Sequence, residues 1–448
     1  MSVHAYKQPF KADTLTFELA KESGKIYSKA MLLNKKEHKS FKEITKIMEK
    51  YCKENRKYLH SQSAQASYQN FITNLKSFFE ALKTFNKNPS GFSGKPRPPH
   101  KNKFMYKIIF KKSAIHCNNG YMLLSVKKPY EPIKIKWAKD LPIPLWVEIS
   151  YNKYDGWNIS FVMEEKCELL ELDKNKVMTI DPGNKRTATT FNNVDSEVTT
   201  YNGKIIMSLV RLRNVVDGRI KTKQSKCKKR SRYYKILARV KRKIVKRIKN
   251  KENDILHKYS RKIVNDAVSK GIGKIVSGDN SSTHNKTDCG KQNQKIQQNP
   301  ERKLIKLVEY KFARVGGQAE AGHEQYTSRT CPKCGYVKKT SPKGRTYSCS
   351  NPIKCDFAYD RDGVGAIGIM KKNVSNVSFD HKEWLDVVGG LTPPIGVKYH
   401  KKTPRLSLVS SNRNKIPNNC LASNGENSIL GNFSELVNLE KLEEPHVL

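Results

Sequence analysis

The 448-residue sequence lacks long apolar runs, has few acidic residues and shows no pairing pattern among its cysteines. A membrane-spanning helix needs about 18–20 consecutive apolar residues, and no stretch of this chain approaches that length. The residues after Met1 do not resemble a signal peptide. We therefore expect no membrane partner and no secretion. Six of the cysteines are scattered along the chain, which favours a reducing compartment over a disulfide-bonded secreted fold.

The shortage of acidic residues leaves a large positive charge. The chain has 86 Lys and Arg against 41 Asp and Glu, a formal net charge of +45. Lysine and arginine neutralise phosphates and release condensed counterions, so this excess indicates a polyanionic partner. It is a poor match to an ordinary metabolic enzyme. A soluble basic protein that binds nucleic acid only adventitiously is the alternative interpretation.

In the N-terminal third, the spacing of the apolar residues changes along the chain. Residues 16–85 are mainly helical by apolar spacing, and the Pro-, Gly- and Ser-rich stretch 88–99 is typical of a linker. Beyond the linker the period becomes two. Residues 147–151 and 157–162 alternate in polarity and flank a turn that contains Gly156, which predicts a β-hairpin.

The most basic helical stretch spans residues 228–251. An apolar stripe at helical spacing runs through it, and Lys and Arg fill the other faces. The residues that we expect to contact nucleic acid are Lys228, Lys229, Arg230, Arg232, Arg239, Lys241, Arg242 and Lys243. A solvated, coiled-coil-like hairpin is the alternative. A second amphipathic helix over 255–268, a short buried strand over 274–277 and a polar loop over 279–301 should follow.

Four cysteines have the spacing of a metal site. Cys331 and Cys334 form a CxxC knuckle followed by Gly335, where a tight turn brings both sulfurs to one metal ion. Cys349 and Cys355 form a second, looser pair, because five residues separate them instead of two. Four thiolates suit tetrahedral zinc and leave no open coordination position, so we predict one structural zinc ion. Four thiols grouped by coincidence are the alternative.

Acidic residues flank this cysteine module. Asp181 ends an apolar strand over 177–180, and the Pro182-Gly183 turn leaves its carboxylate at the strand end. Asp362 follows the last cysteine. Hydrolysis of a phosphodiester needs charge neutralised on the attacking and leaving oxygens, which two Mg²⁺ ions about 3.5–4 Å apart can do. Carboxylates from distant segments must converge to hold them. An ordinary turn is the alternative for Asp181.

Three sequence blocks, in this order, resemble the signature motifs of Fanzor and TnpB proteins. They are TIDPG at residues 179–183, YTSRTCPKCG at 326–335 and DRDGVGA at 360–366. Fanzor and TnpB are transposon-encoded, RNA-guided DNA endonucleases related to type V CRISPR effectors. The resemblance covers residues 174–375. The N-terminal region is similar to the family only in its arrangement.

The resemblance implies a RuvC domain with an Asp, Glu, Asp site. Asp181 matches the first residue and Asp362 the last, with Asp360 as the alternative. The middle position departs from TnpB, because Gly278 stands where Glu is expected and has no side chain to bind a metal. Fanzor proteins carry a rearranged Glu just upstream of the zinc knuckle, and Glu324 occupies such a position.

Two further points stay open at the sequence level. Asp279, which follows the glycine, is the second candidate for the middle carboxylate. Val364 stands two residues after the Asp-Arg-Asp motif, where TnpB has Asn, so the local packing there departs from the TnpB pattern.

The implied fold class is a multidomain α/β protein with an RNase H-like (RuvC) nuclease domain that contains an inserted four-cysteine zinc module. An N-terminal β-barrel with a helical insertion should precede it. The expected domains are a wedge-like barrel (1–15 and 96–170), a helical recognition insertion (16–95), a RuvC-like nuclease domain (171–375) with the zinc module (329–358), and a C-terminal tail (376–448).

The predicted function is RNA-guided, Mg²⁺-dependent DNA cleavage. A guide RNA of the omega type would select double-stranded target DNA by pairing, while the protein reads the heteroduplex shape and a short adjacent motif. We expect a monomeric protein in a ribonucleoprotein. A nuclear location follows from the eukaryotic and viral habit of Fanzor proteins. The alternatives are an unguided RNase H-like transposase or resolvase, and a catalytically inactive zinc protein that binds nucleic acid.

Overall fold

The computed structural model of the chain divides into two compact units, Met1–Cys167 and Glu168–Leu448. It describes residues 2–409 except for 90–91, 93, 100–101, 139, 153–155, 166–168, 280–297, 341, 343, 352–354, 375–393 and 401–405. Most of the expected polar loop and of the expected C-terminal tail therefore lies outside the described residues. None of the helices in the described part is both long and apolar enough to cross a bilayer. The division into the four expected domains stays a prediction.

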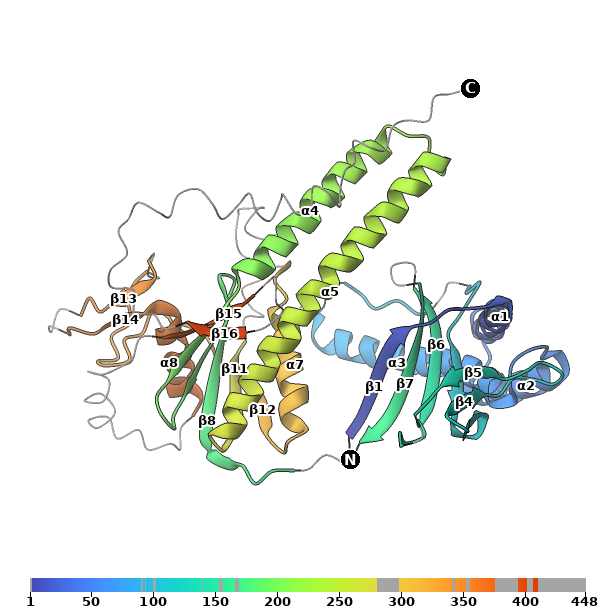
Figure 1. Ribbon diagram of the computed structural model, residues 1–448, viewed down its shortest axis with the longest axis horizontal. Coiled ribbons are helices and arrows are strands. Elements are labelled where there is room, and N and C mark those ends of the chain that lie inside the picture. Colours follow the sequence, from blue (N-terminus) through green and yellow to red (C-terminus); the bar gives the residue numbers. More distant parts are fainter. Residues whose placement is uncertain are drawn as a thin grey trace. The chain divides into compact units, whose positions relative to one another are not determined.

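Unit 1 contains two antiparallel sheets with the strand orders β1-β7-β6-β2 and β3-β4-β5 (Figure 1). Their strands are β1 (Ser2–Pro9), β2 (Ile108–Lys111), β3 (Ile115–Asn118), β4 (Tyr121–Leu124), β5 (Ile133–Lys136), β6 (Trp146–Asn152) and β7 (Gly156–Glu165). Val147 pairs with Phe161 and Ile149 with Ile159, and all four side chains are buried. This register confirms the predicted hairpin. No ladder joins the two sheets within the described strands, so the expected barrel stays a prediction.

Helices pack with these sheets around one apolar core in unit 1. They are α1 (Thr14–Glu37), α2 (Phe41–Asn55) and α3 (Ser61–Lys87), with a 3-10 turn η2 (Lys112–Ala114). Ser40 and Glu43 form a capping box that satisfies two N–H groups at the start of α2. The carboxylate of buried Glu22 accepts the backbone N–H groups of residues 57–59 and fixes the approach to α3. The helical character predicted for residues 16–85 is confirmed by α1, α2 and α3.

Unit 2 is built on a seven-stranded mixed sheet with the order β12-β11-β8-β9-β10-β15-β16. Its strands are β8 (Asp173–Pro182), β9 (Arg186–Asn192), β10 (Val198–Asn202), β11 (Ile272–Gly278), β12 (Gln318–Gly322), β15 (Ile395–Tyr399) and β16 (Leu406–Val409). β8, β11 and β12 are parallel, and β9 is antiparallel to β8 and to β10. β11 confirms the strand predicted over 274–277. β15 and β16 fall in the expected tail, so this part of the tail belongs to the sheet.

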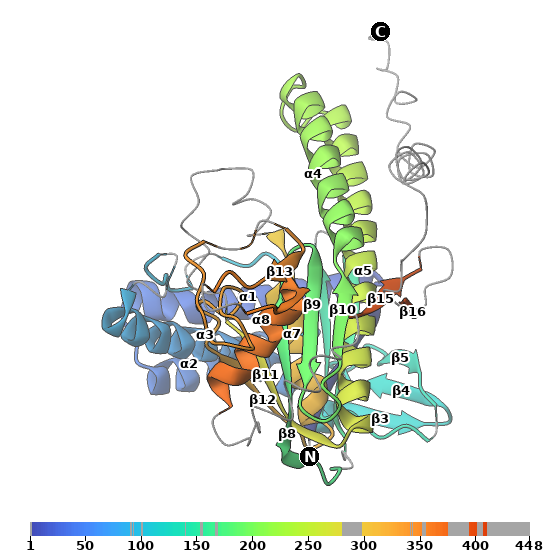
Figure 2. The same ribbon diagram turned by 90° about the vertical axis from the view of Figure 1, so that its left-hand side faces the viewer.

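Helices cover both faces of this sheet (Figures 1 and 2). They are α4 (Lys204–Ser225), α5 (Arg232–Ser269), α7 (Glu301–Ala313) and α8 (Arg361–Asn373). Ile180 and Ile275 share a buried cluster with α5 and α7, whereas Val177 and Val276 share another with α8. Side chains alternate between the faces of a strand. Asp181 therefore lies on the α8 face, together with Val177.

α4 and α5 form an antiparallel hairpin that extends beyond the sheet (Figures 1 and 2). Leu237 and Ile248 of the predicted apolar stripe are fully buried, in one cluster with Val216 and Ile220 of α4. The two helices expected over 228–251 and 255–268 are one continuous helix of 38 residues, so the expected break is wrong. The polar stretch between them contains neither Gly nor Pro, and nothing there ends the helix.

Candidate active site and four-cysteine centre

Three parallel strands of unit 2 end side by side. Ile180 pairs with Ser277, and Gly278 pairs with Gly322. The residue after Ile180 is Asp181, so this carboxylate and the two glycines lie at one level of the sheet. The edge at which parallel strands end is a common location for ligand sites in open α/β sheets. The candidate catalytic residues surround this edge.

Asp181 points toward the first turns of α8. A Cβ atom at Gly365 would lie 2.3 Å from Asp181 Oδ2, so the glycine leaves the space that the carboxylate occupies. Thr179, on the same face of β8, donates to the backbone oxygen of Ala366 at 2.8 Å and fixes the strand against the helix. Burial raises the pKa of Asp181, and the neighbouring carboxylates of Glu324 and Asp362 raise it further. A cation bound there would oppose this shift.

Glu324 lies over Gly278. A Cβ atom at Gly278 would lie 2.5 Å from Glu324 Oε2. The chain before Glu324 is tied to the end of α8, because Asn373 accepts from the N–H of His323 at 2.7 Å and donates to its backbone oxygen at 3.0 Å. After it, Thr327 Oγ1 donates to the Glu324 backbone oxygen at 2.9 Å. Glu324 is thus held at the strand edge, in the electrostatic neighbourhood of Asp181.

Asp279 has a different position from Glu324. Its N–H donates to the backbone oxygen of Gly322 at 3.0 Å, and its side chain is exposed. Because side chains alternate along an extended strand, position 279 faces away from the side shared by Gly278 and Asp181. The geometry favours Glu324 as the neighbour of Asp181.

The two aspartates at the start of α8 also differ. Asp360 caps the helix by accepting the N–H groups of Asp362 and Gly363, each at 3.1 Å. It also forms a two-point ion pair with Arg186, whose Nη2 lies 2.9 Å from Oδ2. The charge of Asp362 contributes to the raised pKa of Asp181. The surroundings favour Asp362 as the residue that faces the strand edge.

Asp362 is held by arginines. Its Oδ2 pairs with Arg345 and lies 3.4 Å from Arg186 Nη1, and its Oδ1 lies 3.2 Å from Arg361 Nη2. A metal ion needs ligand atoms that lie close together. Among the described residues, the cysteine cluster is the only group of His, Cys, Asp or Glu side chains whose ligand atoms all lie within 4.8 Å of one another. The three carboxylates are therefore neighbours without converging to that distance. Asp362 thus has three arginine contacts, and the positive charge of a bound cation would compete with them.

Sequence reasoning missed the arginines around Asp362 and a further buried carboxylate, Glu301. Glu301 is 8% exposed, begins α7 and contributes to the raised pKa of Asp181. It accepts from Asn299 Nδ2 at 3.1 Å, and the same nitrogen lies 3.3 Å from the backbone oxygen of Gly183. The available signal was weak: Pro300 followed by Glu is typical of a helix start but not of a site.

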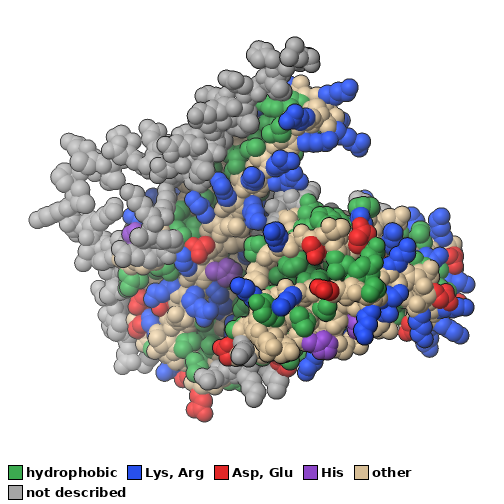
Figure 3. All heavy atoms as spheres, turned by 45° about the vertical axis from the view of Figure 1, so that its right-hand side comes forward, with side chains coloured by type: hydrophobic (Ala, Val, Ile, Leu, Met, Phe, Trp, Pro, Cys, Tyr) green, Lys and Arg blue, Asp and Glu red, His purple; other side chains and the backbone are tan. Residues whose placement is uncertain are grey.

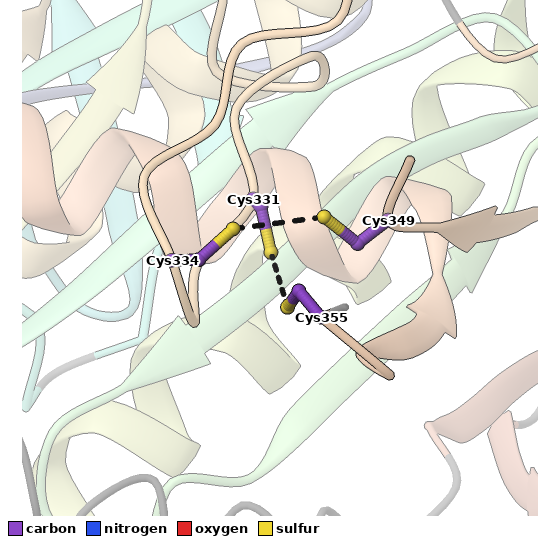
Figure 4. Close-up of side chains that lie close together, drawn as sticks. All are labelled: Cys331, Cys334, Cys349 and Cys355. Atoms are coloured by element: carbon purple, nitrogen blue, oxygen red, sulfur yellow. Dashed lines mark hydrogen bonds between the residues drawn. The ribbon is translucent and has the colours of Figure 1, made fainter. Parts of the chain in front are cut away.

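The four predicted metal ligands converge (Figure 4). Cys331 Sγ lies 3.9 Å from Cys355 Sγ, Cys334 Sγ lies 3.6 Å from Cys349 Sγ, and all four sulfurs are within 4.8 Å of one another. Sulfurs about 2.3 Å from a tetrahedral zinc ion would lie about 3.8 Å apart. The thiols therefore fit a single tetrahedral metal ion.

The cysteine centre is continuous with the candidate active site. The first knuckle turns at Gly335, whose φ is 74° and whose N–H donates to the backbone oxygen of Cys331 at 3.0 Å. Cys331 is buried in the cluster that packs α8 on the sheet. Short strands β13 (Thr346–Ser348) and β14 (Ala358–Asp360) pair in the module, and β14 leads directly into α8. The module therefore packs against α8 and positions the start of that helix.

The basic residues predicted to contact nucleic acid lie toward the tip of the α4–α5 hairpin, where Figure 3 shows many Lys and Arg side chains. Lys228, Lys229 and Arg230 are exposed in the turn between the helices. On α5, exposed or half-buried positions are held by Arg232, Arg239, Arg242 and Lys243. Lys241 differs, because its Nζ pairs with Asp217 of α4. The tip thus carries a dense set of cations with few acidic neighbours.

Comparison with known proteins relates the chain to TnpB-like and Cas12f1 proteins. Residues 302–369 match the family model of the Cas12f1-like TNB domain. A TnpB-like protein of Methanocaldococcus jannaschii is 27% identical over 216 residues, which cover 46% of this chain and 72% of that protein. A cryo-EM structure of a Cas12f1-sgRNA-target DNA complex is similar in fold, with a TM-score of 0.51 and 14% identity over 79% of this chain and 81% of that one. The chain is thus similar in sequence to a TnpB-like protein and similar in fold to Cas12f1.

Proposed function

For this chain, with its TnpB-like sequence and Cas12f-like fold, we propose RNA-guided cleavage of DNA. The observation that carries the proposal is the placement of Asp181, Glu324 and Asp362 around one edge of three parallel strands. The order and directions of the strands in unit 2 support an RNase H-like, RuvC-type domain. The similarity to a TnpB-like protein and to Cas12f1 supports the reaction class.

Asp181, Glu324 and Asp362 would hold two Mg²⁺ ions. Bound there, these cations would neutralise the attacking and leaving oxygens of the phosphodiester and supply an activated water. The donor set fits, because oxygen ligands suit Mg²⁺ and the glycines at 278 and 365 leave room for two of the carboxylates. In the cation-bound site, Asp362 would exchange its contact with Arg345 for a contact with the metal. An arginine released in this way would be suited to a phosphate oxygen of the substrate.

The site would be of the rearranged Fanzor type. Gly278 takes the place of the strand glutamate expected in TnpB, and the Glu324 carboxylate lies against it. Position 279 faces away from the side shared by Gly278 and Asp181, which supports the assignment of Glu324. The four cysteines would bind one structural zinc ion, since their separations match a tetrahedral thiolate site and no ligand position would stay open.

A guide RNA and double-stranded target DNA would be the partners. The Cas12f1 complex that this fold resembles contains an sgRNA and target DNA, and the net charge of +45 supports polyanionic partners for this chain. Sequence selection would come from pairing with the guide. The helices and sheets of unit 1 would act as recognition and wedge domains. We expect one protein chain per ribonucleoprotein and a nuclear location.

The decisive test begins with the RNA that accompanies the purified protein. The proposal expects a discrete species, part of which can be replaced to redirect cleavage to a chosen DNA sequence in the presence of Mg²⁺. Asp181→Asn should keep the RNA and lose cleavage. An unguided transposase or resolvase would act on DNA without RNA, and an inactive binding protein would not cut at all. Either result would overturn the proposal.

A further inference from the structure

Tyr326 combines an unfavourable backbone with an exposed aromatic ring. Its φ is 63°, in the left-handed region that residues with a Cβ atom rarely adopt, and its side chain is 60% exposed. It lies two residues after Glu324. Residues held in such conformations cluster at functional sites, where the surrounding structure fixes them.

The surrounding contacts fix this turn firmly. The backbone oxygen of Tyr326 accepts from the N–H of Arg329 at 2.9 Å, and from the N–H and Oγ1 of Thr330 at 3.1 and 2.9 Å. Thr327 is buried and packs on α8 at Gly368, where a Cβ atom would lie 2.8 Å from the Thr327 backbone oxygen. The ring is therefore presented on a rigid segment, although it is exposed to solvent.

An arginine backs the ring. The guanidinium carbon of Arg329 lies 5.2 Å from the centroid of Tyr326. Arg329 is itself held, because Nε donates to the backbone oxygen of Lys338 at 2.8 Å and Nη2 donates to that of Lys339. The Arg329 cation is fixed on one face of the ring, which is 60% exposed. The rest of the ring is therefore open to a planar ligand.

A purely structural role does not account for these features. A turn that needs positive φ is formed with less strain by Gly or Asn. An exposed ring contributes little apolar burial. Proteins that hold single-stranded nucleic acid do so with exposed aromatic rings and nearby cations, because every base has a face on which to stack.

We propose that Tyr326 is a stacking platform for an unpaired base of a single DNA strand, and that it positions the phosphodiester beside Glu324. The inference rests on the proposed nuclease function and deepens it. Tyr326 is a positioning residue, since it acts through the base and not on the reacting phosphate. Stacking is tolerant of base identity, so it suits an enzyme whose sequence choice is made elsewhere.

The test uses the full-length protein and a single-stranded DNA that carries 2-aminopurine at successive positions, without added Mg²⁺. The fluorescence of this base falls when it stacks. Tyr326→Asn removes the ring and suits the left-handed backbone, and Tyr326→Phe keeps the ring. Tyr310→Ala is the matched control, because Tyr310 is 42% exposed on α7, with the guanidinium carbon of Arg314 6.0 Å from its ring centroid.

Quenching that peaks at one position should occur with the natural protein, Tyr326→Phe and Tyr310→Ala. Tyr326→Asn should lose it and bind the strand about tenfold more weakly. If Tyr326→Asn shows the same quenching and affinity as the natural protein, the inference is overturned. Loss of zinc from that variant would also overturn it, because it would show that Tyr326 has a structural role. The readout needs no cleavage. Guided cleavage tests the proposed function and quenching tests the stacking, so either can fail without the other.

Discussion

Glu324 and Gly278 occupy complementary positions at the edge of the sheet. Gly278 ends β11 and Glu324 follows the end of β12 by two residues, yet a Cβ atom at Gly278 would lie only 2.5 Å from Glu324 Oε2. A side chain at position 278 is therefore incompatible with the position that the Glu324 carboxylate occupies in this structure. The absence of a side chain at 278 and the presence of the carboxylate at 324 are two parts of one arrangement.

The smallest side chain at position 278 should disturb this arrangement. Gly278→Ala places a methyl group against the Glu324 carboxylate and forces it to move. A displacement of about 1 Å at a catalytic group can cost roughly 100-fold in rate. We expect a fall of that order in DNA cleavage, measured under single-turnover conditions, with RNA and DNA binding unchanged.

A matched glycine on α4 controls for this substitution. A Cβ atom at Gly218 would meet nothing within 4 Å. Gly218→Ala should therefore leave cleavage unchanged and favour the helix. If Gly278→Ala cuts DNA as fast as Gly218→Ala does, the carboxylate does not depend on the space at position 278.

Removal of the cysteine metal should unfold its module. Joint replacement of Cys331 and Cys334 by Ser removes one knuckle, and thiolate coordination supplies folding free energy in such small modules. We expect one zinc ion per chain in the natural protein, none in the variant, and cleavage lost because β14 no longer positions α8. Cys117→Ser, at an exposed position in unit 1, should retain the zinc. A folded, active, zinc-free variant would contradict the assignment.

The hairpin tip should carry a salt-dependent share of the RNA affinity. Replacing Lys228, Lys229 and Arg232 by Gln should weaken RNA binding and lower the slope of log affinity against log salt by about one for each lost phosphate contact. Lys241→Gln is the control, because this lysine is already paired with Asp217. Equal slopes for the triple variant and the natural protein would show that the tip is only a solvated surface.

Lys311 should make the stability of unit 2 depend on alkaline pH. It is 6% exposed, and its Nζ lies 2.6 Å from both the His257 backbone oxygen and Ser260 Oγ. Burial, aided by the charge of Arg261, lowers its pKa to about 8.

The direction of this dependence follows from proton binding. An unfolded chain keeps the Lys311 proton up to a pKa of about 10.4, so the unfolded state binds more protons between pH 8 and that value. The free energy of unfolding should therefore rise with pH across this window and be unaffected by Lys311 below it. Lys311→Met should lack this rise, as measured by hydrogen exchange of α7 in both proteins at matched pH. Parallel pH profiles would contradict the lowered pKa.

Local patterns predicted the elements whose structure depends on neighbouring residues. The alternation around Gly156 predicted the β6–β7 hairpin, and the spacing from Cys331 to Cys355 predicted a cluster that the structure closes to within 4.8 Å. The break expected between residues 251 and 255 is absent from α5, because a polar stretch without Gly or Pro does not end a helix.

The sequence alone does not predict contacts between segments that are far apart in the chain. Nothing local indicates that Arg345, within the cysteine module, pairs with Asp362, or that Glu301 lies near Asp181. The preference for Glu324 over Asp279 depends on the alternation of β11 and on how the chain leaves β12. Motifs indicated which residue types matter, and the sheet decides which of them meet.

The most direct test of the account compares two conservative variants of the candidate carboxylates. Glu324→Gln removes a charge with almost no change in size, and Asp279→Asn does the same at the exposed position. Guided cleavage of matched DNA is measured for both, with RNA and DNA affinity as controls. We expect Glu324→Gln to bind RNA and DNA normally and not to cut, whereas Asp279→Asn should retain substantial activity. Normal cleavage by Glu324→Gln together with an inactive Asp279→Asn would contradict this expectation.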